Sequence, residues 1–268
     1  MVQGEGGFQL TGTGAEAYER YMVPIHCVAL AEDLVDRVNV RPRERVLDVA
    51  CGTGVVSRRA AQRVGSFGQV TGIDLNPEMI DVARSAAAYI DQIEFLEGSA
   101  LELPVADGRY DVALCQQAIM FLPDRERAAR EMYRALKPGG RVGLNVFRTL
   151  EYLPAFAHLI RALEKHSSPS AAEFMRSPFV MESVGQMRSL FEQAGFVNIE
   201  VLIRIDTLRY PSVAHLVRYE TLNIPDDDIR TEQVQTALTR EMESLVEANV
   251  DDQGVVFPVQ QFVVTAER

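Results

Sequence analysis

The chain has 268 residues, of which 47% are hydrophobic and 24% charged, and its formal net charge is −11. This length suits one large α/β domain, or a core with a lid, that buries its core without disulfides or metals. Proteins that grip nucleic acid concentrate Lys and Arg against the phosphates, and anionic membrane surfaces also attract cations. The acidic balance, with a pI of about 4.9, therefore argues against nucleic acid and membrane surfaces as partners.

The chain has an odd number of cysteines, and they are widely spaced: Cys27, Cys51 and Cys115. This indicates reduced thiols rather than a disulfide framework or a zinc site. The first 14 residues are polar and rich in glycine, and they lack the apolar run of a signal peptide. No stretch approaches the roughly 18 apolar residues of a membrane helix. We therefore expect a cytoplasmic protein without a metal centre.

The first predicted element is a helix over residues 15–38, which Pro24 is expected to interrupt. Strands and helices then alternate. The expected strands cover residues 45–50, 69–74, 93–100, 110–117 and 141–147, and the expected helices cover residues 55–64, 77–90 and 124–136. Residues 137–140 read as a helix stop. Such alternation predicts βαβ units and a parallel sheet.

The second half of the chain has a different pattern. Residues 150–193 and 211–249 are expected to be mostly helical, with a polar break at residues 166–170. A strand is expected within residues 195–210, and a final strand over residues 257–267.

The main chemical signal is the sequence VLDVACGTG at Val46–Gly54. An apolar strand leads into a glycine turn and then a helix, whose free N–H groups and partial positive charge favour a ligand. Open α/β sheets bind ligands at this end of their strands. The dinucleotide fingerprint needs a third glycine three residues after Gly54, where this chain has Ser57. Asp48, inside the strand, is positioned to receive an ammonium group.

Further signals stand at the ends of the next strands. Asp74 closes the second strand, where an acidic residue can bridge two ribose hydroxyls. Met79, early in the following helix, is placed to pack on an adenine face. Ser99 follows the third strand, and Gln116 ends the fourth.

These segments resemble the class I S-adenosylmethionine (SAM)-dependent methyltransferases, and most closely the small-molecule branch that includes the ubiquinone- and menaquinone-biosynthesis enzymes. The matching segments, in order, are VLDVACGTG, GIDLNPEMIDVAR, EFLEGSALELPVADGRYDVALCQQAIMFLPD and LKPGGR, within residues 45–147. The resemblance fades after residue 150. It implies a Rossmann-like α/β fold with a seven-strand, mostly parallel sheet, helices on both faces, and the last strand antiparallel beside the sixth.

The resemblance also implies which residues hold SAM. Asp48 and the backbone from Ala50 through Gly52 to Gly54 would hold the methionine part, and Asp74 the ribose hydroxyls. The remaining contacts implied are Leu75 and Met79 on the adenine faces, Ser99 and Ala100 at the adenine edge, Gln116 beside the methionine part, and Tyr21 over its carboxylate. The family often has Asp where this chain has Ser99, so we expect a weaker contact there.

On this basis the chain is one methyltransferase domain over residues 1–268, with the SAM-binding core and N-terminal helix in residues 15–149. Residues 150–193 and 211–249 would form a helical lid that sets specificity, and residues 257–267 the final strand. A methyl-transfer site must exclude water, and the two insertions are rich in apolar and aromatic residues. We therefore expect a small, apolar or aromatic acceptor.

Direct displacement at a sulfonium methyl group requires alignment and desolvation, and a general base only when the nucleophile arrives protonated. The histidines that could act as the base are His26, the first choice, and His158, His166 and His215. The sequence assigns no catalytic residue. A binding protein for SAM or S-adenosylhomocysteine (SAH) without transferase activity stays an alternative, and an NAD-dependent oxidoreductase a lesser one. The oligomeric state is open, with a homodimer as one option.

Overall fold

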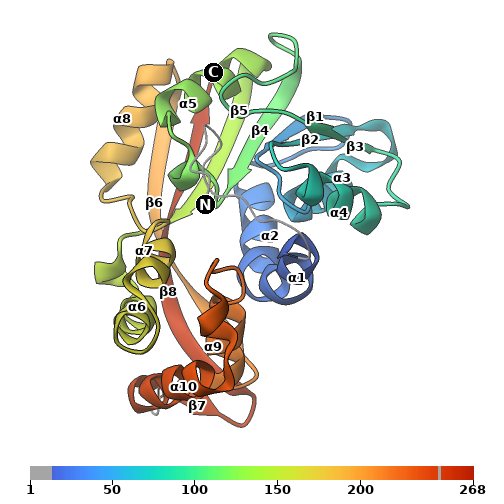
Figure 1. Ribbon diagram of the computed structural model, residues 1–268. Helices are drawn as coiled ribbons and strands as arrows, with labels where there is room; N and C mark the ends of the chain where they lie inside the picture. The colour runs from blue at the N-terminus through green and yellow to red at the C-terminus, as the bar shows by residue number, and fades with distance from the viewer. Residues whose placement is uncertain (1–13, 247–248) are drawn as a thin grey trace.

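The computed structural model describes residues 14–246 and 249–268. All of the glycine-rich start of the chain except Gly14 lies outside the described residues. The strands are β1 (Arg45–Val49), β2 (Gln69–Asp74), β3 (Ile93–Glu97), β4 (Tyr110–Gln116), β5 (Leu136–Phe147), β6 (Val197–Tyr210), β7 (Val250–Asp251) and β8 (Gly254–Glu267). They form a single sheet with helices on both faces (Figure 1).

The sheet order is β3-β2-β1-β4-β5-β8-β6, with β7 attached to β8. The pairs among β1 to β5 are parallel, whereas β8 runs antiparallel to both β5 and β6. This confirms the predicted Rossmann-like fold with its antiparallel last strand. The sheet has eight strands rather than the expected seven because the two-residue β7 folds back on the start of β8. The strand order switches direction on either side of β1, where such sheets open a crevice.

The helices of the first half match the predicted alternation. They are α1 (Gly14–Ala17), η1 (Tyr18–Cys27), α2 (Val28–Arg37), α3 (Val55–Val64), α4 (Pro77–Ala86) and α5 (Arg125–Ala135), with short 3₁₀ turns η2 (Gly65–Phe67) and η3 (Ile119–Phe121). Asn76 caps α4 by accepting a hydrogen bond from the N–H of Glu78, and Asp124 caps α5 in the same way. Strand β5 begins directly after α5, so the predicted helix stop at residues 137–140 lies within the strand.

The N-terminal helix differs from the prediction at Pro24. The chain stays helical from Gly14 to Arg37, and its central segment η1 is a π-helix that contains the proline. Proline has no N–H, and its ring would collide with the carbonyl four residues earlier in an α-helix. The wider π-helical turn accommodates the proline without ending the helix. It also brings Tyr18, Met22 and His26 to one side of the helix, where they line the same cavity.

Side chains of β1 alternate between the two faces of the sheet. Val46 packs in a cluster with α2 and α3, whereas Leu47 and Val49 pack in a cluster with α5 and α8 (Val184–Ala194). Because neighbouring residues of a strand point to opposite faces, Asp48 faces the α3 side together with Val46. This alternation places its carboxylate against the first turn of α3.

The lid has a hydrophobic cluster of its own. Its elements are η4 (Leu150–Tyr152), α6 (Pro154–His166), α7 (Pro169–Arg176), α9 (Val213–Glu220), η5 (Asp227–Arg230) and α10 (Glu232–Val246). β6 and β8 pair as far as Tyr210 and Val255, but β5 reaches β8 only up to Gln261. The outer halves of β6 and β8 therefore extend beyond β5 as a two-stranded ribbon toward α9 and α10 (Figure 1). Leu208, Tyr210 and Phe257 of this ribbon pack in the lid cluster.

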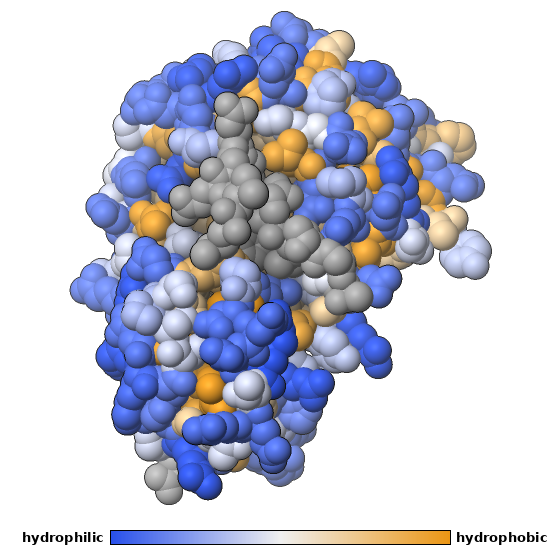
Figure 2. Space-filling model, viewed as in Figure 1, coloured by the Kyte–Doolittle hydropathy of each residue, from blue (hydrophilic) through white to orange (hydrophobic). Residues whose placement is uncertain are grey.

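Two predicted lid boundaries need correction. Helix α8 lies within the predicted insertion 150–193, yet Met187, Leu190 and Phe191 pack in the cluster of α5 and the sheet. The outer halves of β6 and β8, which were expected to be ordinary sheet strands, belong to the lid. On the face shown in Figure 2, the surface of the lid is predominantly hydrophilic. Among the helices that the structure describes, none has the length and apolarity needed to cross a membrane.

A substitution at Gly54 tests how closely the start of α3 must approach Phe95 of the sheet. Its φ is +81°, and a Cβ added there would lie 2.7 Å from the ring of Phe95. We predict that Gly54→Ala lowers the free energy of unfolding by about 2–4 kcal/mol, combining left-handed strain with overpacking. Urea denaturation measures the effect. Gly139→Ala is the matched control, because its φ is +75° but an added Cβ meets nothing within 4 Å. Equal losses in both variants would contradict the proposed clash with Phe95.

Candidate functional site

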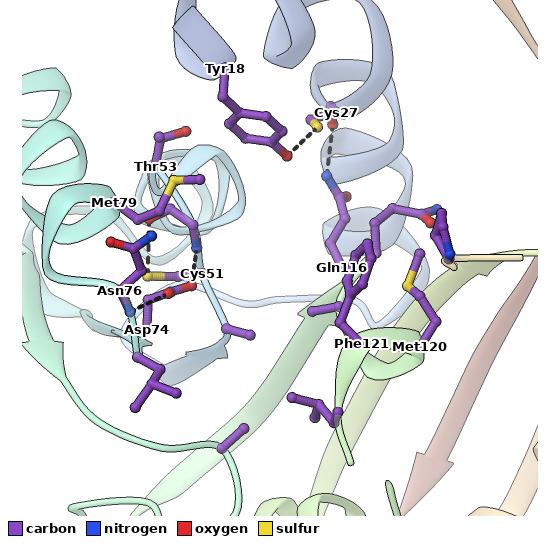
Figure 3. Close-up of a pocket in the computed structure, with 18 of the residues that line it drawn as sticks. Tyr18, Cys27, Cys51, Thr53, Asp74, Asn76, Met79, Gln116, Met120 and Phe121 are labelled. Atoms are coloured by element: carbon purple, nitrogen blue, oxygen red, sulfur yellow. Dashed lines mark hydrogen bonds between the residues drawn. The ribbon is translucent and has the colours of Figure 1, made fainter. Parts of the chain in front are cut away.

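A cavity opens at the carboxyl ends of β1, β2 and β4, beneath the lid and η1. One part, called the polar end, is formed by Asp48, Gly52, Thr53, Asp74 and Asn76. In Figure 3, Thr53, Asp74, Asn76 and Met79 stand on one side of the cavity, and Cys27, Gln116, Met120 and Phe121 on the other. The opposite part, called the aromatic end, is formed by Phe147, Phe156, Phe174 and Phe179, with His26 and Glu220.

Asp48 is buried in β1 with an incomplete set of partners. The hydroxyl of Ser57, on α3, donates to its Oδ2 at 2.6 Å, whereas its Oδ1 has no hydrogen-bond partner among the described residues. Burial raises the pKa of Asp48 from 3.8 to about 7, although the Ser57 hydrogen bonds oppose this rise. The buried hydroxyl of Thr53 is likewise unpartnered. This end of the cavity therefore offers an acceptor that a cationic hydrogen-bond donor would satisfy.

Asp74 shapes the turn after β1 as well as lining the cavity. Its Oδ2 accepts the N–H of Gly52 at 2.8 Å, and its Oδ1 accepts the N–H of Asn76 at 2.9 Å. Burial raises the pKa of this carboxyl, and the backbone hydrogen bonds oppose that rise. An ionised carboxylate has about four acceptor positions, and the N–H groups of Gly52, Leu75 and Asn76 do not use all of them, so acceptor capacity remains for a ligand.

The backbone of the glycine turn is strained where it faces the cavity. Ala50 has a φ of +54°, which is uncommon for a residue other than glycine. Gly52 also has a φ of +54°, and a Cβ added there would meet nothing within 4 Å, so its flank is open. Ala50 and Gly52 line the cavity, but Gly54 does not. Gly54 instead begins α3 and packs against Phe95, which is a structural position.

The four predicted adenine contacts all line the cavity. They are Leu75, Met79, Ser99 and Ala100. The oxygen of Ser99 already accepts the N–H of Leu101 at 3.1 Å. This local bond occupies part of the hydroxyl's acceptor capacity, which is a physical reason to expect little from Ser99 as a ligand contact.

The tyrosine that the N-terminal helix places at the cavity is Tyr18 rather than the predicted Tyr21. Tyr21 does not line the cavity; its ring stacks on Tyr219 of the lid at a centroid distance of 4.9 Å. Tyr18, three residues earlier, lines the cavity instead, and its hydroxyl lies 3.3 Å from Cys27 Sγ (Figure 3). A contact of Tyr21 with the carboxylate of SAM stays a prediction, since its ring faces Tyr219 of the lid in this structure.

Gln116 lines the cavity as predicted and also joins two elements. Its Nε2 donates to the carbonyl of Cys27 at 3.0 Å, and its Oε1 accepts from Asn145 at 3.3 Å. Burial raises the pKa of the Cys27 thiol to about 11, so it stays protonated at neutral pH. This thiol is therefore a weak candidate for a nucleophile.

The aromatic end was only partly foreseen. Apolar residues of the lid were expected near an acceptor, and Phe156, Phe174 and Phe179 line the cavity. Phe147, Glu220 and Asn223 carried no sequence signal. Of the four histidines, His26 lines the cavity, whereas His158 and His166 contact Glu241 and His215 contacts Ser212. Among the residues that the structure describes, no Lys or Arg lines the cavity. The sequence of residues 1–13 and 247–248, which lie outside the described residues, also contains no Lys or Arg.

Comparison with known proteins decides the family. A family profile described as a methyltransferase domain matches residues 46–140. The demethylmenaquinone methyltransferase of Staphylococcus aureus (strain JH9) is 32% identical over 175 residues, which cover 61% of this chain and 72% of that protein. The chain belongs to the class I SAM-dependent methyltransferases. As a member of this family it uses SAM as its methyl donor.

Solved structures agree on the fold of this methyltransferase. Phosphoethanolamine N-methyltransferase 2 of Haemonchus contortus, in complex with S-adenosyl-L-methionine, gives a TM-score of 0.62 at 20% identity, over 96% of this chain and 57% of that chain. The cyclase SpnF gives a TM-score of 0.58 at 18% identity, over 100% of this chain and 87% of that chain. Likeness at these identities shows the fold alone. A cyclase with this fold also illustrates that chemistry is decided by the site.

The polar end fits the cofactor of this family. SAM carries an ammonium group that would satisfy the unpartnered Oδ1 of Asp48, and ribose hydroxyls that would reach the free acceptor positions of Asp74. The open flank of Gly52 leaves room for the methionine part.

The pKa of Asp48 predicts how the ligand-free methyltransferase responds to pH. Because its folded-state pKa of about 7 lies above the ordinary 3.8, Asp48 favours the folded state at low pH. That contribution is lost as the pH rises from about 4 through about 7. We predict that wild-type protein loses stability from about pH 5 to pH 8, relative to Asp48→Asn, by up to a few kcal/mol. Thermal unfolding across this range measures the difference, and parallel profiles would contradict the burial of an ionisable Asp48.

Proposed function

We propose that the polar end of the cavity holds SAM and that the aromatic end holds the acceptor, with the reacting atoms meeting between them. Asp48 binds the ammonium group and Asp74 the ribose hydroxyls. Leu75 and Met79 contact the adenine, while Ala50, Gly52 and Gln116 surround the methionine part. Tyr18 replaces Tyr21 in this assignment because Tyr18 lines the cavity. The observation that carries the proposal is the unpartnered carboxylate oxygen of Asp48 beside the open turn at Gly52.

SAM, when bound, supplies a methyl group on a sulfonium that is already a good leaving group. The protein's own contribution is therefore to align the acceptor and to exclude water. Lid residues Phe156 and Phe179, with ring centroids 5.2 Å apart, and Phe147 of β5 form an apolar wall for that purpose. The polar end belongs to the core, and the aromatic end combines lid residues with Phe147 of β5 and His26 of η1, so the reactants meet where the core and the lid join.

The acceptor is a small, uncharged aromatic molecule. The aromatic end offers flat apolar surfaces that suit stacking, and the cavity lining has no Lys or Arg to pair with a phosphate or a carboxylate. The net charge of −11 acts in the same direction, because it repels polyanions such as RNA and DNA. The relative from Staphylococcus aureus, which is named for demethylmenaquinone, supports an acceptor of this kind.

The state of the cysteines bears on the cellular compartment of the enzyme, and an exposed strand bears on its oligomeric state. Cys27, Cys51 and Cys115 are buried free thiols, which fits the reducing cytoplasm. A homodimer stays a prediction. The feature that supports it is strand β6, the last of the sheet order, whose residues Ile203 and Ile205 are exposed.

The SAM site can be tested through Asp74. We predict that Asp74→Ala weakens SAH binding by one to two orders of magnitude, because hydrogen bonds to a charged acceptor are worth about 1.5–3 kcal/mol. Calorimetry measures the affinity, and NAD is titrated in parallel with no binding expected. Asp81→Asn is the control, because Asp81 is an exposed aspartate on α4. Asp74→Asn keeps one acceptor for the turn, so it separates ligand binding from turn distortion. Unchanged SAH affinity in folded Asp74 variants would refute the assignment.

The acceptor class can be tested by release of SAH from SAM. We expect turnover with small hydroxylated aromatic compounds, and none with phosphoethanolamine or RNA, which find no cationic partner in the cavity. Phe179→Ala should raise the KM for an aromatic acceptor about tenfold by removing an apolar contact, while leaving SAH affinity unchanged. Turnover of phosphoethanolamine in preference to aromatic compounds would contradict the proposed acceptor.

A further inference from the structure

Three polar side chains meet at the aromatic end from distant parts of the chain. His26 lies on η1, Tyr210 ends β6, and Glu220 ends α9. His26 Nε2 is 2.7 Å from Glu220 Oε1 and 2.8 Å from the Tyr210 hydroxyl, which itself donates to Glu220 Oε1. His26 and Glu220 are each 8% exposed, and Tyr210 is fully buried. Such a network within an aromatic wall requires its polar atoms to be satisfied.

The network fixes which nitrogen of His26 carries its proton. A carboxylate only accepts hydrogen bonds, so Nε2 must hold a proton to bond with Glu220. In the neutral imidazole the lone pair then lies on Nδ1. Nδ1 has no hydrogen-bond partner among the described residues. Because His26 lines the cavity, Nδ1 is the ring nitrogen left for a ligand there.

The carboxylate of Glu220 is the charged group in contact with the His26 imidazole. The titratable neighbours of His26 are Tyr210, Glu220 and, on its own helix, Cys27. Burial raises the pKa of Tyr210 well above its ordinary value, so it stays neutral, as Cys27 does. The other rings in contact with the His26 imidazole are those of Phe147 and Phe156, which carry no titratable group. In the described residues the ion pairs of Glu220 involve only His26, so the carboxylate is available to stabilise an imidazolium.

We propose that His26 Nδ1 accepts the proton of a phenolic hydroxyl on the acceptor, while Glu220 holds the imidazole in the required tautomer. This inference rests on the proposed function and names the substrate class of the same cavity. The O–H bond breaks and its proton moves to Nδ1. The oxygen electron pair forms the new bond to the methyl carbon, and the electrons of the S–CH₃ bond remain on sulfur. His26 then releases the proton to water, so the reaction yields a methyl ether, SAH and one proton.

The test uses 4-nitrophenol as a probe without SAM. Its anion is yellow and its neutral form is colourless, so absorbance at about pH 6 reports proton transfer to the protein. We expect wild-type protein to raise the ionised fraction of the bound probe, and His26→Gln to reduce that ionised-to-neutral ratio about tenfold, which is one pKa unit. Glu220→Gln should give an intermediate loss. His158→Gln, at a histidine outside the cavity, is the matched control and should behave like wild type.

Two further measurements keep the proposal falsifiable. Nitrogen-15 NMR of histidine-labelled wild-type protein, recorded well above the ordinary imidazole pKa of about 6.5, should show His26 with its proton on Nε2, and a second proton on Nδ1 once the probe binds. A proton on Nδ1 before the probe is added would overturn the proposal, as would unchanged probe ionisation in folded His26→Gln or none in wild type. SAH binding is measured separately by calorimetry. Loss of SAH binding alone would refute the SAM site, and loss of probe ionisation alone would refute the role of His26.

Discussion

A carboxylate buried in an interior strand of the sheet, β1, constrains this enzyme more than any other group. Asp48 is 1% exposed, has one side-chain donor in Ser57, and keeps an oxygen without a partner. A buried charge is unfavourable until a cation or further donors satisfy it, so the elements around Asp48 must leave a ligand access to it. The glycine turn, the left-handed Ala50 and the carboxylate of Asp74 all serve that opening. In the proposed SAM site, ligand binding and the stability of the ligand-free fold are thereby linked through one side chain.

The rest of the molecule divides into two hydrophobic systems that share one sheet. Parallel strands β1, β2 and β4 bring Asp48, Asp74 and Gln116 to a common edge, because their carboxyl ends lie together. The lid packs around its own cluster and is attached through the ribbon of β6 and β8. The cavity lies where these systems meet, and η1 closes its remaining side. His26 and Glu220 join η1 to the lid across that boundary.

Sequence reasoning was accurate where the relevant interactions are local. The strands of the first half and the positions of Asp48 and Asp74 follow from strand, turn and helix signals within a few residues of each other. Tyr21 was predicted from the resemblance alone, and sequence periodicity does not reveal that the π-helical turn containing Pro24 places Tyr18 at the cavity. Helix α8 has the same amphipathic pattern whether it covers the sheet or the lid. The contact of His26 with Glu220 spans 194 residues, so no local pattern predicts it.

The ribbon of β6 and β8 has an evolutionary consequence. Main-chain hydrogen bonds join the two strands of this ribbon to each other from Arg204 to Tyr210, and these bonds are largely independent of side-chain identity. Residues of the lid cluster can therefore be exchanged for others of similar volume without disturbing Asp48 or Asp74, because the apolar strand neighbours of these aspartates pack in other clusters. A lineage carrying this architecture is free to diversify the molecules that it methylates while inheriting one cofactor site intact. The same separation makes the lid the natural target for directed evolution toward new acceptors.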